Sequence, residues 1–126
     1  MIEVACAVIV KDGKVLIAQR GPGRDEGYWE FPGGKKMSGE TIFKAAEREL
    51  REELGLSIRA KKVLKTTRLK TNNGIELLLV FVECYCNNFD IELKEHISAI
   101  HVSLEELKNY EFIKGDLEFV KWLISQ

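Results

Sequence analysis

Residues Gly34–Leu56 read GKKMSGETIFKAAERELREELGL and carry the strongest helix signal of the chain. Thr41 suits the N-cap position, because its hydroxyl can accept a hydrogen bond from the first turn. Gly55 stands where a helix commonly ends in a left-handed residue, a conformation that glycine adopts without strain. Between them, apolar residues recur at helical spacing and predict one buried stripe, formed by Phe43, Ala46, Leu50 and Leu54. The stretch therefore predicts a helix from about Thr41 to Leu54.

A cluster of carboxylates lies beside that stripe on the predicted helix. At about 100° per residue, Glu49, Glu52 and Glu53 fall on one face within little more than one turn. Two carboxylates about 5 Å apart repel by roughly 3 kcal/mol at an effective dielectric of about 20. The cluster is tolerable either as a solvated face or with a divalent cation among the carboxylates. Hard cations such as Mg²⁺ prefer oxygen ligands, but the spacing alone leaves both interpretations open.

Strand signals surround this helix on both sides. Ile2–Val10 is apolar and rich in β-branched residues, as expected of a buried strand. Asp12-Gly13 is a hairpin signal that leads to a second strand at Val15–Gln19, and Gly21–Gly27 is predicted to be a mobile loop. The other predicted elements are an extended piece at Trp29–Phe31, strands at Ile58–Leu69, Ile75–Cys86 and Ser98–Val102, and helices at Leu104–Asn109 and Gly115–Ser125. This mixture predicts an α/β or α+β fold, and the length suits one domain over residues 1–126.

The chain is close to electroneutral, with 19 basic and 20 acidic side chains and a formal net charge of −1. A nucleic-acid coat protein needs a broad basic face, so no nucleic-acid polymer is expected as a partner. The basic run from Arg59 to Lys70 is interpreted as a solvated edge strand. The longest apolar runs, Ala5–Val10 and Leu77–Val82, are far shorter than the roughly 18–20 residues of a membrane span, and no secretory signal is recognisable. Three cysteines without zinc-site spacing favour reduced thiols and a cytoplasmic location.

The quoted stretch also matches a known motif at every specified position. The pattern is G-x5-E-x7-R-E-U-x-E-E-x-G-U, where U is a bulky aliphatic residue, and it is met by Gly34, Glu40, Arg48, Glu49, Leu50, Glu52, Glu53, Gly55 and Leu56. The chain therefore resembles a Nudix hydrolase. The preceding WEFPGGK, Trp29–Lys35, resembles the MutT-type branch, which cleaves nucleoside triphosphates, and the segments around Glu95-His96 and Asp116 also fit. The resemblance implies an α/β/α sandwich, with a mixed β-sheet between helices.

The resemblance also implies a hydrolytic site. A Mg²⁺ or Mn²⁺ cofactor is expected on the carbonyl of Gly34 and the carboxylates of Glu49, Glu52, Glu53 and Glu95. Such cations neutralise phosphate oxygens and lower the pKa of bound water, while a carboxylate beside them accepts the proton. Glu49 is placed first for this base, ahead of Glu52 and Glu95. Arg48 completes the catalytic set, and it is expected to form a supporting ion pair with Glu40.

The expected partner is a small-molecule nucleotide, with the chain acting as a monomer or a homodimer. The residues expected to bind it are Arg20 and Lys35 at the phosphates, and Phe31 and Asp116 at the base. An ionised Asp116 only accepts hydrogen bonds, which suits an exocyclic amine such as cytosine N4, whereas a protonated one also donates. His96 and His101 are interpreted as structural or exposed, because neither has a partner at metal-ligand spacing.

Three functions remain in competition. The first is hydrolysis of a nucleoside triphosphate, such as 8-oxo-dGTP, to the monophosphate and pyrophosphate, as in sanitation of the nucleotide pool. The second is the same reaction on CTP, dCTP or a modified cytidine triphosphate. The third is a nucleotide sensor without catalysis, a class that commonly lacks carboxylates of the motif. All of them are present here, which favours an enzyme.

Overall fold

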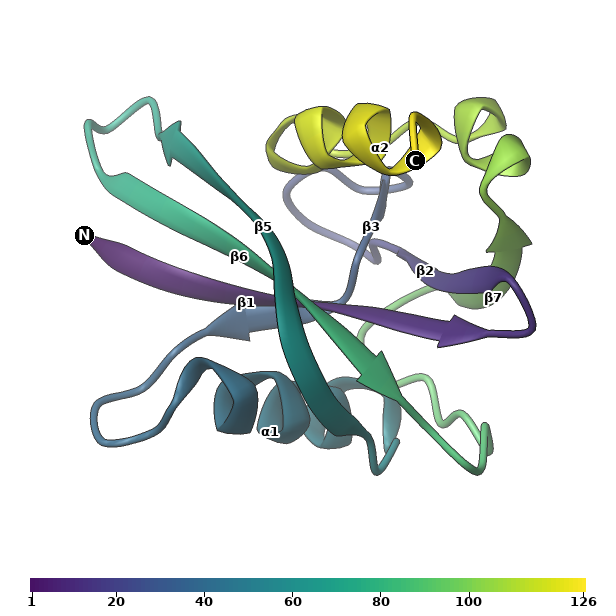
Figure 1. The fold of residues 1–126 in the computed structure, drawn as a ribbon. Coiled ribbons are helices and arrows are strands. Elements are labelled where there is room, and N and C mark those ends of the chain that lie inside the picture. The colour runs from purple at the N-terminus through teal and green to yellow at the C-terminus, as the bar shows by residue number, and fades with distance from the viewer.

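The computed structural model describes all 126 residues (Figure 1). Its strands are β1 (Ile2–Lys11), β2 (Lys14–Gln19), β3 (Trp29–Glu30), β4 (Gly33–Lys35), β5 (Arg59–Lys70), β6 (Glu76–Tyr85) and β7 (Ser98–Ser103). The α-helices are α1 (Ile42–Leu54) and α2 (Leu117–Ile124), and short 3₁₀ turns span Glu105–Asn109 and Lys114–Asp116. None of the helices has the length and apolarity needed to cross a bilayer.

The seven strands form one mixed sheet in which β1 is central. β1 runs parallel to β6, in register from Ile2 opposite Leu77 to Ile9 opposite Cys84, while all other pairs are antiparallel. On its other edge, the first half of β1 pairs with β4 and its last residues pair with β2. β2 in turn pairs with β3 and β7. β4 and β2 therefore occupy successive parts of the same edge of β1.

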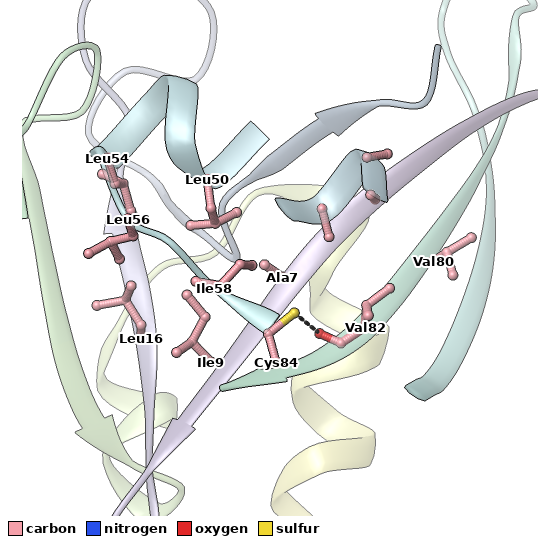
Figure 2. Close-up of a cluster of buried hydrophobic side chains, with 13 residues drawn as sticks. Ala7, Ile9, Leu16, Leu50, Leu54, Leu56, Ile58, Val80, Val82 and Cys84 are labelled. Carbon is pink, nitrogen blue, oxygen red and sulfur yellow. Dashed lines mark hydrogen bonds between the residues drawn. The ribbon is translucent and has the colours of Figure 1, made fainter. Parts of the chain in front are cut away.

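Alternate side chains of β1 face two separate hydrophobic cores. Ala5, Ala7 and Ile9 belong to the core beneath α1, which Figure 2 shows packed around Leu50, Leu54 and Cys84. Cys6 and Val8 face the opposite core, where Phe31, Phe81 and Phe119 pack together with α2. Figure 1 accordingly shows α1 and α2 on opposite sides of the sheet. The expected α/β/α sandwich with a mixed sheet is confirmed.

The ends of α1 follow the sequence expectation closely. The Thr41 hydroxyl accepts a hydrogen bond of 3.1 Å from the Lys44 N–H, and Gly55 is left-handed with φ of 66°. The expected apolar stripe is wrong at Phe43, whose side chain is 36% exposed near the N-terminal end of the helix. Ala45 is buried instead, together with Ala46, Leu50 and Leu54.

Strand β4 is not predicted from the sequence, whereas the edge strand β5 is. The residues of β4, Gly33, Gly34 and Lys35, have little intrinsic preference for strands. β5 carries the basic run and pairs only with β6, so the expected edge strand is confirmed. Its register shifts near Lys62 and Lys65, and such bulges with exposed lysines protect a sheet edge from pairing with other chains.

Candidate active site

The C-terminal half of α1 presents its carboxylates to different surroundings. Glu53 is buried, with 7% exposure, whereas the side chain of Glu52 is 57% exposed on the outer surface of the helix. The Glu49 carboxylate lies against Gly34 of β4, where an added Cβ would stand 2.4–2.6 Å from it. Gly34 therefore has a steric role, since any side chain there would displace Glu49. The three glutamates predicted as one cluster divide into two that face inward and one that faces solvent.

Arg48 holds this part of the helix in place through several hydrogen bonds. Its guanidinium donates to Glu40 at 2.8 and 3.0 Å, to Glu49 at 2.9 Å and to Glu52 at 3.1 Å. A further bond of 3.0 Å reaches the carbonyl of Lys35 in β4. The bonds from Arg48 and from the Met37 N–H lower the pKa of Glu40 to about 2. The predicted Arg48–Glu40 pair is thus present, and it also ties α1 to β4.

A buried acid–histidine cluster adjoins Glu53 and does not follow from the sequence. The His96 Nε2–H donates to Glu30 Oε2 at 2.7 Å, and the same nitrogen lies 3.8 Å from Glu53 Oε1. The other Glu30 oxygen accepts from Arg20 Nη1 at 2.8 Å. Of the two interpretations from the sequence, the structural one applies to His96, and its partners come from β3 and α1, which no spacing along the chain reveals. Of these partners, only Glu30 could have been suspected from the sequence. Side chains alternate along the extended WEFPGGK segment, so Glu30 faces the side opposite to Trp29 and Phe31.

Burial and crowding of negative charge strongly perturb Glu53. Desolvation, then the hydrogen bond to Glu49 and the charges of Glu30, Glu49 and Glu95, raise the pKa of Glu53 to about 10. In the cation-free protein, burial therefore favours the protonated form of Glu53. Ionising a further carboxylate of this cluster is unfavourable, because the new negative charge would be buried beside the others. A cation among them would offset that cost.

These groups line a polar cavity of about 700 Å³. Its walls contain no hydrophobic residue and consist of Arg20, Gly21, Pro22, Glu30, Gly33, Gly34, Lys35, Glu49, Glu53, Lys94, Glu95 and His96. Glu95 is exposed at the rim, and three basic side chains stand among the four glutamates. The predicted residues Arg20, Gly34, Lys35, Glu49, Glu53 and Glu95 are therefore brought together. Glu52, Glu40 and Arg48 lie behind this wall and do not line the cavity.

A second cavity of about 480 Å³ adjoins the first along Arg20, Glu30 and the segment from Gly33 to Lys35. It is more apolar, and it includes Cys6, Phe31, Leu79 and Asp116. Phe31 is buried and stacks on Phe112 with ring centroids 5.7 Å apart, so it serves the core as well as the cavity wall.

Asp116 is the charged group buried most deeply in this second cavity, with 2% exposure. Its Oδ2 accepts a hydrogen bond of 2.9 Å from the Phe31 N–H. Desolvation raises the pKa of Asp116 to about 7, helped by the charge of Glu30 and opposed by the Phe31 bond and by Arg20. Near neutral pH the carboxyl is thus available both as an acceptor and as a donor.

The cavity of this mixed α/β/α sandwich combines carboxylates with basic side chains, which suits a cation and a phosphorylated small molecule. The model of the NUDIX domain family matches residues 1–123, and the chain belongs to this family. It is a Nudix hydrolase, an enzyme of phosphoanhydride bonds.

Two curated relatives are informative. The CTP pyrophosphohydrolase of Escherichia coli strain K12 is 33% identical over 124 residues, which cover 96% of this chain and 90% of that protein. The 8-oxo-dGTP diphosphatase of Proteus vulgaris is 43% identical over 68 residues, which cover 52% of this chain and 60% of that protein. The first match includes both cavities, because it extends over nearly the whole chain.

Two solved structures match the fold along its length. The solution structure of the E. coli ORF135 protein has a TM-score of 0.85 at 31% identity, and the match covers 99% of this chain and 89% of that one. The crystal structure of a MutT protein from Methanosarcina mazei Go1 has a TM-score of 0.83 at 24% identity, over 97% of this chain and 91% of that one. The second likeness supports the fold alone.

Nudix hydrolases generally need a divalent metal, and the donor set of the polar cavity fits one. Carboxylate oxygens, a backbone carbonyl and waters are the ligands that Mg²⁺ and Mn²⁺ prefer. Desolvation by burial, and then the nearby carboxylates, raise the pKa of Glu53, so a bound cation would favour its ionised form. Glu30, Glu53 and His96 place one potential ligand atom each within 4.8 Å of one another, but the Nε2–H of His96 is donated to Glu30, so the carboxylates are the available donors.

Proposed function

We propose that this enzyme hydrolyses a nucleoside triphosphate to the monophosphate and pyrophosphate with the help of a divalent cation. The observation that carries the proposal is the continuity of the two cavities. A carboxylate-lined cavity suits the cation and the phosphates, and the adjoining cavity ends at a buried carboxyl suited to a base edge. Arg20 stands between them, where the triphosphate would pass.

In this proposal each side chain has a defined task. Glu49, Glu53, Glu95 and the carbonyl of Gly34 hold the cation, which neutralises phosphate oxygens and makes water a better nucleophile. Glu52 stands at the edge of the site and supports Arg48. Arg20 and Lys35 bind phosphate oxygens, because both are basic and both line the two cavities.

The proton of the attacking water goes to a carboxylate of the cavity. Glu49 already accepts a hydrogen bond from the Arg48 guanidinium, which reduces its basicity. Glu95 is exposed at the cavity rim and takes part in no ion pair, so we assign the role of general base to it. The sequence favours Glu49 as the general base, and we now place Glu95 ahead of it.

Asp116 favours cytidine nucleotides as substrates. A protonated carboxyl can donate its O–H to cytosine N3 while its carbonyl oxygen accepts from the N4 amine, which gives two bonds to one base edge. The raised pKa of Asp116 keeps this protonated form accessible near neutral pH. The relative that matches over most of its length is named CTP pyrophosphohydrolase, in agreement with this choice.

The second candidate substrate is 8-oxo-dGTP. An ionised Asp116 can accept from both N1–H and the N2 amine of a guanine edge, and the Proteus vulgaris relative is named 8-oxo-dGTP diphosphatase. A guanine edge thus suits the ionised carboxyl, whereas cytosine gains its second hydrogen bond, at N3, only from the protonated form.

Hydrolysis of a substrate panel tests the proposal. The panel contains the common NTPs and dNTPs, 8-oxo-dGTP and ADP-ribose, each incubated with Mg²⁺ or Mn²⁺, and products are identified by chromatography. We expect pyrophosphate and CMP or dCMP as the main products, and no turnover in a chelator. Highest kcat/KM for 8-oxo-dGTP would favour the second candidate, and release of pyrophosphate from no triphosphate would contradict the proposed function.

Asp116→Asn is expected to stabilise the protein above neutral pH. The pKa of Asp116 rises from 3.8 to about 7 in the fold, so the native state binds this proton more tightly than the unfolded state. Its contribution to stability is fully present below about pH 4 and is lost between about pH 4 and pH 7, by up to about 4 kcal/mol in all. Thermal melts from pH 5 to 9 should show wild type weakening relative to Asp116→Asn.

The exposed Asp90→Asn is the matched control for these melts, and its curve should follow that of wild type. Parallel curves for wild type and Asp116→Asn would show that the Asp116 carboxyl does not titrate in this range.

The Asp116→Asn variant also tests base selection, because an asparagine side chain cannot ionise. Asp116→Asn should therefore lose the pH dependence of the preference between cytidine and guanosine substrates.

A further inference from the structure

His96 occupies a place that the proposed chemistry does not use directly. Its Nε2–H donates to Glu30 at 2.7 Å, and it lies 3.8 Å from Glu53. Glu30 in turn accepts from Arg20 at 2.8 Å through its second oxygen. The imidazole therefore stands between two halves of the site, with a phosphate-facing arginine on one side and a cation-facing glutamate on the other.

The main chain holds His96 firmly at this point. The N–H of the next residue, Ile97, donates to the Gln19 carbonyl at 2.9 Å, at the end of β2. Gly21 packs on the Glu95 carbonyl so closely that a Cβ would lie 2.2 Å from its oxygen. The segment with Glu95 and His96 is thereby fixed beside Arg20. A side chain at position 96 can reach Glu30 and Glu53 because of these two contacts.

The burial of this cluster is costly unless the arrangement serves the site. The His96 side chain is 5% exposed, and its Nδ1 is buried without a hydrogen-bond partner. Buried polar atoms without partners are rare, because they lose their bonds to water. A leucine or methionine would fill a core position without that cost. An imidazole is instead able to donate to Glu30 from a fixed, planar ring.

We propose that His96 is a positioning residue that holds Glu30 in a fixed orientation beside Glu53, and so keeps Arg20 and the cation ligands aligned for one triphosphate. The inference rests on the proposed function, since it takes Glu53 as a cation ligand and Arg20 as a phosphate ligand. It assigns no contact between His96 and the substrate. Residues that orient ligands in this way commonly change metal affinity or activity by about 10–100-fold when they are replaced.

Mn²⁺ titration of the substrate-free protein is the direct test, followed by KM and kcat for the best triphosphate of the panel. In His96→Leu, which removes the donor, we expect Mn²⁺ affinity to fall by at least about tenfold and KM to rise. In His96→Gln, the side-chain amide can replace the Nε2–H, so most of both losses should be recovered. His101→Leu is the matched control, because His101 packs on Phe89 away from the cavity, and it should bind Mn²⁺ as wild type does.

Circular dichroism and thermal melts establish that each variant is folded. If His96→Leu does not fold, His96→Asn replaces it, because its shorter amide does not extend to the position of Nε2. Unchanged Mn²⁺ affinity in the folded donor-less variant would overturn the inference. Equal losses in His96→Gln and the donor-less variant would overturn it too, since shape and not hydrogen bonding would then matter.

Failure of this inference is distinguishable from failure of the proposed function. The Mn²⁺ titration needs no substrate, so it reports on His96 even if no triphosphate in the panel is hydrolysed. Conversely, a wild-type enzyme that releases pyrophosphate while all His96 variants bind Mn²⁺ normally would retain the proposed function and reject the role of His96.

Discussion

Glu53→Gln is expected to reduce turnover by at least about 10³-fold, a loss that corresponds to about 4 kcal/mol in the activation barrier. Glu53 is buried, lies beside Glu49 and His96, and faces the carboxylate-lined cavity. A neutral amide is a poorer ligand for a hard cation and cannot supply the negative charge that the cation needs. Steady-state kinetics over a range of Mg²⁺ concentrations measures the loss, and excess Mg²⁺ should not restore turnover.

The same substitution should leave the thermal stability of the cation-free protein nearly unchanged. Because burial raises the pKa of Glu53 and favours its neutral form, a neutral glutamine of the same shape suits the same buried site in the cation-free protein. Loss of activity and loss of folding are therefore separable in this variant. The matched control is Glu47→Gln on the same helix, where Glu47 accepts from the Ala60 N–H outside the cavity. Near-normal turnover in Glu53→Gln would mean that the cation site is misplaced.

Arg48→Lys is expected to reduce turnover by about 100-fold while the protein remains folded. The guanidinium of Arg48 bonds at once to Glu40, Glu49, Glu52 and the carbonyl of Lys35. A lysine ammonium is a compact charge with a different geometry and cannot meet all four acceptors. Glu49 should then lose its fixed orientation against Gly34. A fall in Mn²⁺ affinity, measured together with kcat, would show that the effect acts through the ligands.

Arg51→Lys is the matched control for this prediction, because Arg51 is exposed on the same helix and lies outside the cavity. Its kinetics should equal those of wild type. If Arg48→Lys behaved in the same way, the hydrogen bonds of Arg48 would be incidental to the chemistry.

The sequence predicts best those parts of the molecule that local interactions determine. The helix from Thr41 to Leu54 is predicted almost to the residue, because its capping groups and apolar spacing all lie within the segment. The long strands β1, β2, β5 and β6 are also predicted, since each has a continuous run of strand-forming residues. The exposure of Phe43 is not predicted. Helical periodicity shows which face of the helix is apolar, but not how far along the helix the core extends.

The parts that the sequence does not reveal depend on contacts between distant segments. Glu30, His96 and Glu53 come from three separate elements, and no spacing along the chain relates them. The division of the carboxylates on α1 into inward-facing and solvent-facing groups has the same cause. Glu53 is buried because the segment at His96 covers it, whereas nothing covers Glu52. The strand β4 exists because β1 offers it an edge for pairing.

The two faces of the sheet have a consequence for how such an enzyme can diverge. The cation-facing glutamates belong to α1 on one face, whereas Asp116 comes just before α2 and packs near Leu79 and Phe31 on the other. Under the proposed function, changes in the 3₁₀ turn at Lys114–Asp116 or in the β5–β6 connection at Thr71-Asn72, which lines the same cavity, would alter the accepted nucleobase without rebuilding α1. Duplicated genes encoding this fold could acquire new substrates in a few mutational steps, each intermediate still able to cleave a triphosphate.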